Sequence, residues 1–188
     1  SSDLTAVALK RLRAEGIVIR EGCRVDRIEG TLGRIRAAVT ENGEPSFVDA
    51  THLLVAAGRK PNVADLGLDA AGIKYDKTGI IVSKALTTSN SRVYAIGDVI
   101  GGLQFTHVAN YHAGIVIRRT LFRLPAKVKT GHIPWVTYTD PEIANIGLTE
   151  EAARKQHGKV NVYRWPYHEN DRAQAERVTD GLVKVVTD

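Results

Sequence analysis

The chain has few of the residue types from which disulfide-rich, zinc-binding and membrane-spanning proteins are built. A single cysteine among 188 residues excludes an intramolecular disulfide framework, a CxxC redox pair and an all-cysteine zinc site. The longest wholly apolar runs, such as Leu53–Ala57, have about five residues, whereas a membrane-spanning helix needs about 20. The first residues also lack the apolar segment of a signal peptide. We therefore expect a soluble, cytoplasmic protein.

A strong excess of one charge is missing as well. Lys and Arg number 26 and Asp and Glu number 21, which gives a net charge of +5, and no block of five or more like charges occurs. The densest basic stretch, residues 118–129, contains one aromatic residue, Phe122. We interpret this stretch as a solvated face, with an anion-binding role as the alternative, and expect no nucleic-acid partner.

Several motifs of catalysis and cofactor binding are absent. The patterns GxGxxG, GxSxG, HExxH and GxxxxGK followed by Ser or Thr do not occur. His107 and His112 are five residues apart, a spacing that does not align two imidazoles on one helix face. We therefore expect no metal site.

The apolar share of 43% is enough to bury a sizeable core. Helical spacing of apolar residues predicts a helix that begins at Asp3 as its N-cap and ends at Gly16. The pair Asn42-Gly43 is typical of a tight hairpin turn. Short strands are expected around it, at 17–19, 23–28 and 34–39.

The middle of the chain predicts further strands and one long helix. Leu53–Ala57 is a continuous apolar run of strand length, which favours a strand buried on both faces. Arg59–Asn62 is then expected to cross over to another structural unit. Thr106 is the expected N-cap of a helix over 106–122. Two more strands are expected, at 80–83 and 93–96.

A second boundary is expected near residues 125–131. Beyond it, Thr149 is expected to open a helix. Strands are expected on both sides of that helix, at 133–138, 160–165 and 182–187. This mixed order indicates an α+β unit.

The strongest local chemical signal is Thr88–Asp98, an apolar stretch that ends in Gly97-Asp98. The carboxyl ends of strands are where α/β sheets bind ligands. Gly97 would let a ligand approach the backbone, and the Asp98 carboxylate would accept hydrogen bonds from sugar hydroxyls. The free N–H groups of a helix that begins near Thr106 would face a negative partner. The alternative is that Gly97-Asp98 is only a turn after a strand.

Four stretches in this order resemble the pyridine nucleotide–disulfide oxidoreductases, the flavoenzymes that include dihydrolipoamide dehydrogenase, mercuric reductase and glutathione reductase. The stretches are 51–62, 88–98, 139–150 and 180–186. The first is similar to the crossover from the NAD domain to the FAD domain, and the second to the second FAD motif. The other two are similar to parts of the interface domain.

The resemblance implies an α/β and α+β fold in three parts. Residues 1–50 would end a Rossmann-like NAD domain, 51–130 would form the second part of an FAD domain, and 131–188 would begin a dimerisation domain. A homodimer through 131–188 is implied, and this part holds both tryptophans and three of the six tyrosines, residue types enriched in interface cores. The alternative is that these aromatic residues fill the unit's own core.

The resemblance also implies an enzyme that passes electrons between NAD(P)H, FAD and a disulfide, dihydrolipoamide or metal-ion acceptor. Asp98 would anchor the ribitol chain of the flavin, and Gly97 would let the backbone pass close to it. The helix that follows would stabilise negative charge on the reduced flavin with its N-terminus. The other implied cofactor contacts are Gln104, Phe105, Thr106 and His107 for FAD, and Val25 and Gly58 for NAD.

The chain departs from the family pattern in two ways. Its one cysteine, Cys23, cannot form the family's CxxxxC pair and is expected to be buried and structural. No histidine is followed by Glu five residues later, so the family's His–Glu dyad is missing from this stretch. We therefore expect an internal fragment with no catalytic residue of its own, unable to reduce disulfides with NADH by itself. The alternatives are an inactive domain fragment, a split-enzyme subunit or a dimerisation module.

Overall fold

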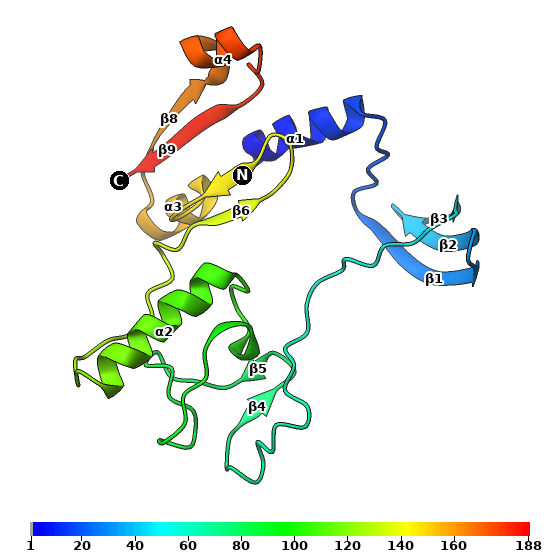
Figure 1. The fold of residues 1–188 in the computed structure, drawn as a ribbon. Helices are drawn as coiled ribbons and strands as arrows, with labels where there is room; N and C mark the ends of the chain where they lie inside the picture. The colour runs from blue at the N-terminus through cyan, green and yellow to red at the C-terminus, as the bar shows by residue number, and fades with distance from the viewer. Residues whose placement is uncertain (1) are drawn as a thin grey trace. The chain divides into compact units, whose positions relative to one another are not determined.

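The computed structural model of the protein describes residues 2–188. Their contacts form two compact units: one is Thr5–Gly58, and the other is Arg59–Asp188 together with the start of the chain as far as Leu4. Figure 1 shows helices and antiparallel strand pairs along the chain, in agreement with the predicted α/β and α+β class. Within this described part, no helix is long and apolar enough to cross a membrane.

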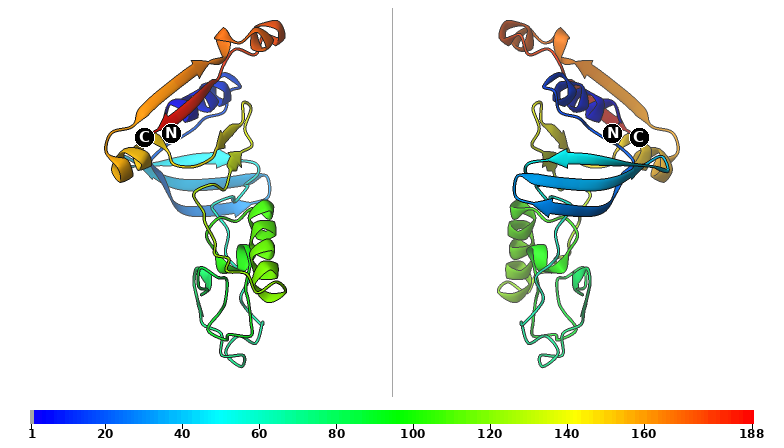
Figure 2. Two further views of the ribbon diagram at one scale, coloured as in Figure 1. Left: turned by 90° about the vertical axis from the view of Figure 1, so that its left-hand side faces the viewer. Right: turned by 90° about the vertical axis from the view of Figure 1, so that its right-hand side faces the viewer.

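A three-stranded antiparallel meander forms most of the Thr5–Gly58 unit. Asn42 and Gly43 join its second and third strands with positive φ angles of 53° and 88°, as a type I′ turn requires, which confirms the predicted hairpin. Helix α1 begins at Ser2, so Asp3 lies in its first turn and the prediction of Asp3 as N-cap is wrong. The elements are α1 (Ser2–Ala14), β1 (Cys23–Thr31), β2 (Arg34–Glu41) and β3 (Glu44–Ala50), and the three strands lie side by side in Figure 2.

Two predicted strands of this unit are irregular backbone. Residues 17–19 and Leu53–Ala57 have no strand partner among residues 2–188, and Leu54 is 88% exposed. A buried strand needs neighbouring strands to pair its N–H and C=O groups, and apolar composition alone does not supply them. The prediction of a strand buried on both faces is therefore wrong here. Cys23, at the start of β1, is half-buried rather than buried.

The first part of the Arg59–Asp188 unit is rich in turns around a small apolar core. Its elements are β4 (Tyr75–Asp76), β5 (Gly79–Ile80), the 3₁₀ helix η1 (Gly97–Ile100) and α2 (Thr106–Thr120). The core consists of Leu68, Ile73, Ile80 and Ala95. The predicted strand over 80–83 is reduced to β5, and the predicted helix over 106–122 ends at Thr120.

The predicted strand over 93–96 does not form. Among the described residues, this stretch forms only one isolated β-bridge, between Thr87 and Tyr94. Its other backbone bonds are those of turns and loops: Thr88 N–H donates to Val93 O at 3.0 Å, and Ala95 N–H donates to Leu86 O at 3.2 Å. Local turns satisfy the backbone here in place of a sheet.

The last part of the same unit consists of two hairpins with short helices. Its elements are β6 (Trp135–Thr137), β7 (Ile143–Asn145), α3 (Glu150–His157), β8 (Asn161–Pro166), η2 (Tyr167–Glu169), α4 (Asp171–Glu176) and β9 (Leu182–Thr187). β6 pairs with β7 and β8 with β9, both antiparallel. Thr149 caps α3 as predicted, because its side chain accepts from Ala152 N–H at 3.3 Å. The domain boundaries after residues 50 and 130 stay predictions.

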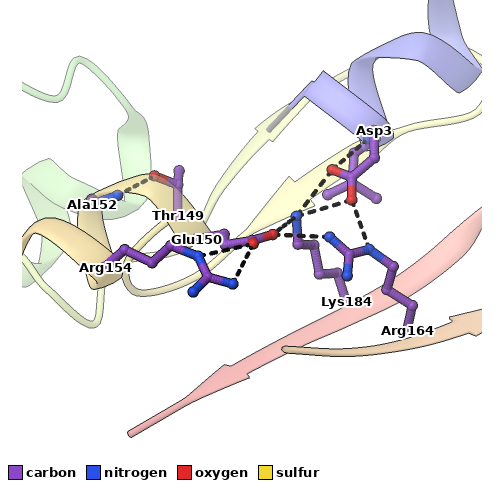
Figure 3. A network of polar contacts seen from close by, with 8 residues as sticks. Asp3, Thr149, Glu150, Ala152, Arg154, Arg164 and Lys184 are labelled. Atoms are coloured by element: carbon purple, nitrogen blue, oxygen red, sulfur yellow. Dashed lines mark hydrogen bonds and ion pairs between the residues drawn. The ribbon is translucent and has the colours of Figure 1, made fainter. Parts of the chain in front are cut away.

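An ion network joins α3, the β8–β9 hairpin and the first turn of α1 (Figure 3). The Lys184 side chain is only 8% exposed, and its Nζ lies 2.9 Å from Asp3 Oδ2 and 2.7 Å from Glu150 Oε2. Arg164 bonds to the same two carboxylates, at 3.0 and 2.9 Å. Hydrogen bonds from Lys184 and then Arg154 lower the pKa of Glu150 to about 2. Ion pairs, in place of apolar contacts, therefore join these three elements.

Candidate functional site

The first half of the Thr88–Asp98 motif holds the fold together. The Thr88 hydroxyl is buried and donates to Asn90 O at 2.9 Å. The Ser89 hydroxyl donates to Gly72 O at 2.7 Å, and the Asn90 amide donates to Ala71 O at 2.9 Å. These side chains bind one turn to another and are therefore engaged in structure.

Asp98 differs from these residues because its side chain has no structural task. It lies in η1, directly after buried Gly97, and its backbone carbonyl accepts from Gly101 N–H at 3.0 Å. The side chain is exposed, and no hydrogen bond or ion pair among residues 2–188 engages its carboxylate. The turn thus exposes an unpaired, acceptor-only group, which suits hydroxyl or N–H donors.

Gly97 is buried against helix α2, and this packing requires a glycine. Its φ is +69°, and a Cβ atom there would lie 3.0 Å from the Cβ of Ala109. Its N–H donates to Nδ1 of His112 at 3.2 Å in a buried hydrogen bond. In the structure, the element that closely approaches the backbone of Gly97 is therefore helix α2. Its predicted contact with the flavin stays a prediction.

Helix α2 packs against η1 through Ala109 and His112, and its start has no side-chain cap. Phe105 occupies the N-cap position, so the prediction of Thr106 as cap is wrong: Thr106 is the first residue of the helix. The first N–H groups of a helix have no partner inside it. The preceding backbone is fixed by Arg59, whose Nη1 donates to Gln104 O at 2.9 Å. An open helix N-terminus and the Asp98 turn thus belong to one packed arrangement.

His107 is engaged with protein backbone. Its Nε2 lies 2.7 Å from Pro134 O, which makes Nε2 the protonated donor nitrogen, and its ring stacks on Phe105 at 5.3 Å between centroids. This arrangement links the start of α2 to the chain just before β6. The predicted flavin contact of His107 remains a prediction.

The two predicted NAD contacts lie in the other unit. Val25 is more than half exposed on β1, beside the bulge between Val25 and Arg27. Gly58 ends the unit with a φ of +120° and open space around its Cβ position. The structure groups Gly97, Asp98 and the start of α2 within the Arg59–Asp188 unit, whereas Val25 and Gly58 belong to Thr5–Gly58.

Sequence reasoning missed one residue of the site, His112. It is the single histidine on the buried face of α2, where the residues four before and three after it, Val108 and Ile115, are buried as well. That spacing is a helical core pattern with a polar residue in it, and this signal would have found His112. In the described part of the chain, no group of three His, Cys, Asp or Glu side chains is placed to hold a metal ion.

Comparisons with known proteins identify the chain's relatives. Residues 1–113 match the family model for pyridine nucleotide-disulphide oxidoreductases, and residues 133–188 match the model for their dimerisation domain. Mercuric reductase of Bacillus cereus is 35% identical over 189 residues, which cover 99% of this chain and 30% of that protein. Dihydrolipoyl dehydrogenase of Bacillus subtilis is 32% identical, over 99% of this chain and 40% of that protein.

Solved structures give the same result. The HOCl-induced flavoprotein disulfide reductase RclA from Escherichia coli superimposes with a TM-score of 0.86 at 28% sequence identity, over 99% of this chain and 42% of that chain. The chain therefore spans less than half the length of the relatives that it matches.

Proposed function

The chain belongs to the pyridine nucleotide-disulphide oxidoreductases, and from that premise we propose that it is the part of a flavoenzyme that holds the ribityl chain of FAD and contributes to the subunit interface. The whole enzyme would pass electrons between NAD(P)H, FAD and a disulfide, dihydrolipoamide or metal-ion acceptor. FAD supplies the redox chemistry when bound, and the residues of this chain bind and orient it. Val25 and Gly58 are the proposed NAD contacts.

The exposed, unpaired Asp98 carboxylate is the observation that carries this proposal. It lies on a turn whose backbone is held by Gly101 N–H and, through Gly97, by α2. A carboxylate accepts hydrogen bonds from adjacent hydroxyls of a sugar alcohol without donating any, which fits a ribityl chain. The N-terminus of α2, the helix that packs against this turn, has no side-chain cap and suits the negative charge of a reduced flavin. The residues present therefore fit the cofactor.

A chimera tests this assignment. In it, the chain replaces the matching stretch of the B. cereus mercuric reductase, and FAD affinity is measured by titration. We expect Asp98→Asn to weaken FAD binding by about tenfold to a hundredfold, the equivalent of one lost charged hydrogen bond. Asp65→Asn is the matched control, because it removes the same charge at another exposed turn of the same unit. Equal FAD affinities for Asp98→Asn and Asp65→Asn would contradict the proposal.

We also propose that residues 131–188 join two copies of the chain. Tyr163 pairs with Val185 and Trp165 with Val183 across β8 and β9, which places all four side chains on one face of the hairpin. Tyr163 is 60% exposed and Trp165 is 56% exposed, so these two aromatic residues do not fill the unit's own core. An exposed aromatic and β-branched face is typical of an interface core.

Sedimentation velocity of the mercuric reductase chimera over a concentration series tests the homodimer, whereas the 188-residue chain by itself is expected to be monomeric at low concentration. We expect Trp165→Glu to shift the distribution to monomer. Val178→Glu, at another exposed apolar residue outside the strands β8 and β9, is expected to leave the dimer intact. A monomeric chimera, or a chimera dimer that Trp165→Glu leaves unchanged, would refute this surface.

A further inference from the structure

His112 is a buried polar side chain that the flavin-binding proposal does not use. It is 5% exposed, in the middle of α2, and lies in the helix face that packs beneath η1. Its Nδ1 accepts the N–H of Gly97 at 3.2 Å, fifteen residues earlier in the chain. Gly97 is the residue directly before Asp98. One hydrogen bond therefore connects the helix interior to the backbone that presents the carboxylate.

The direction of this hydrogen bond determines which ring nitrogen of His112 carries the proton. Because the backbone N–H can only donate, Nδ1 must carry a free lone pair, and the proton of the neutral ring lies on Nε2. Desolvation lowers the pKa of His112, which acts in the same direction. A ring protonated on both nitrogens would face the Gly97 N–H with a second donor.

We propose that His112 is a positioning residue for Asp98: as the neutral, Nε2-protonated ring, it accepts the Gly97 N–H and holds the η1 turn so that the Asp98 carboxylate faces the flavin ribityl chain. This inference rests on the proposed function for its last step. The first step, the hold on Gly97, stands on geometry alone.

The surroundings of the turn show what the loss of this acceptor would do. On one side, Gly97 already packs against Ala109, so it has no room to move toward the helix. On another side, Gly101 approaches Thr78 so closely that an added Cβ would lie 2.2 Å from Thr78 O. Without the ring nitrogen, the buried Gly97 N–H would be an unpaired donor, and it would reach water only if the turn opened.

Two substitutions separate this role from simple packing. His112→Asn keeps an acceptor oxygen near the place of Nδ1 but fills less space, whereas His112→Leu keeps the volume and has no acceptor. A packing role predicts that Leu is tolerated better than Asn. The positioning role predicts the reverse order, so a His112→Asn variant closer to wild type than His112→Leu would distinguish positioning from packing.

The first measurement uses the 188-residue chain and needs no cofactor. Two-bond ¹H–¹⁵N spectra of the wild-type ring are expected to show the proton on Nε2. Amide exchange of Gly97 and Gly101 is expected to be about tenfold or more faster in His112→Leu and close to wild type in His112→Asn. The amide of Ala95, which bonds to Leu86 O, serves as internal reference. A proton on Nδ1, or unchanged Gly97 exchange in the Leu variant, would overturn the hold.

The second measurement is FAD titration of the same variants in the mercuric reductase chimera. His112→Leu is expected to weaken FAD binding by about tenfold, and His112→Asn to restore most of the affinity. Added to Asp98→Asn, His112→Leu is expected to have little further effect, because it acts through Asp98. If Asp98→Asn weakens binding and His112→Leu does not, positioning is refuted. If Asp98→Asn itself has no effect, the flavin assignment fails, while the exchange result decides the hold on Gly97 independently.

Discussion

Replacement of Gly97 by alanine should destabilise the Arg59–Asp188 unit more than any loop glycine exchanged in open space. Two separate costs arise at this position. The residue has a φ of +69°, where an L side chain costs about 1–2 kcal/mol. The new Cβ would also lie 3.0 Å from the Cβ of Ala109, and forcing a methyl group into a packed contact costs about 1–3 kcal/mol. We expect a total loss of about 2–5 kcal/mol.

Gly102 offers a matched control for the first cost. Its φ is +73°, nearly that of Gly97, and nothing lies within 4 Å of its Cβ position. Gly102→Ala should therefore lose only the conformational part, about 1–2 kcal/mol. The second cost is isolated by Ala109→Gly, which removes the opposing methyl group. In the double variant, Gly97→Ala should cost less than in the wild-type background, although Ala109→Gly itself weakens the helix by about 1 kcal/mol.

Urea unfolding followed through the amide signals of Ala95 and Ile115 measures this unit directly, since Ala95 is a core residue and Ile115 is buried in α2. The reasoning fails if Gly97→Ala is no more destabilising than Gly102→Ala. It also fails if the effects of Gly97→Ala and Ala109→Gly simply add, because the contact between the two methyl groups would then carry no energy.

Three further variants test the last part of the unit. Thr149→Ala should lower the stability by about 1 kcal/mol in urea unfolding, and Thr149→Ser should retain it, because only the Ala152 N–H bond is lost in the first. The pKa of Glu150 falls from 4.5 to about 2 on folding, so Glu150→Gln should be less stable than wild type at neutral pH. Urea midpoints in a pH series should converge as the pH falls from 4.5 toward 2, where the wild type loses this contribution; a constant gap would contradict it. Lys184→Met should cost about 1–3 kcal/mol in thermal unfolding, below the value for a fully buried pair because Arg164 still bonds both carboxylates; an unchanged Tm would refute it.

Two local signals in the sequence predicted local structure correctly. The Asn42-Gly43 turn and the Thr149 cap each depend on residues within four positions of one another, and both form as expected. Leu53–Ala57 failed for the opposite reason. Its apolar side chains indicate a strand, but a strand exists only where a neighbour pairs with it, and none of the described residues does so.

The candidate site was predicted in part. Its polar residue, Asp98, was identified from the Gly-Asp ending of the motif, and it lies on an exposed turn as that pattern indicates. The support beneath it was not predicted: the spacing of Val108, His112 and Ile115 indicates a polar residue on the buried face of the helix, but it does not reveal that the partner is Gly97, fifteen positions earlier. Thr106 was misplaced by one residue, since Phe105 precedes the helix with no side-chain cap.

Within the Thr88–Asp98 motif, the side chains of Thr88, Ser89 and Asn90 maintain the fold, whereas the side chain of Asp98 does not. The side chains of Thr88 and Asn90 donate hydrogen bonds to backbone carbonyl groups, and the N–H of Gly97 donates to His112. No described residue bonds to the exposed Asp98 carboxylate, so the stability of the unit does not depend on this group. Its removal should therefore change cofactor affinity far more than stability. For this reason FAD titration, and not a melting temperature, is the measurement that decides whether the motif is a binding site or only a turn.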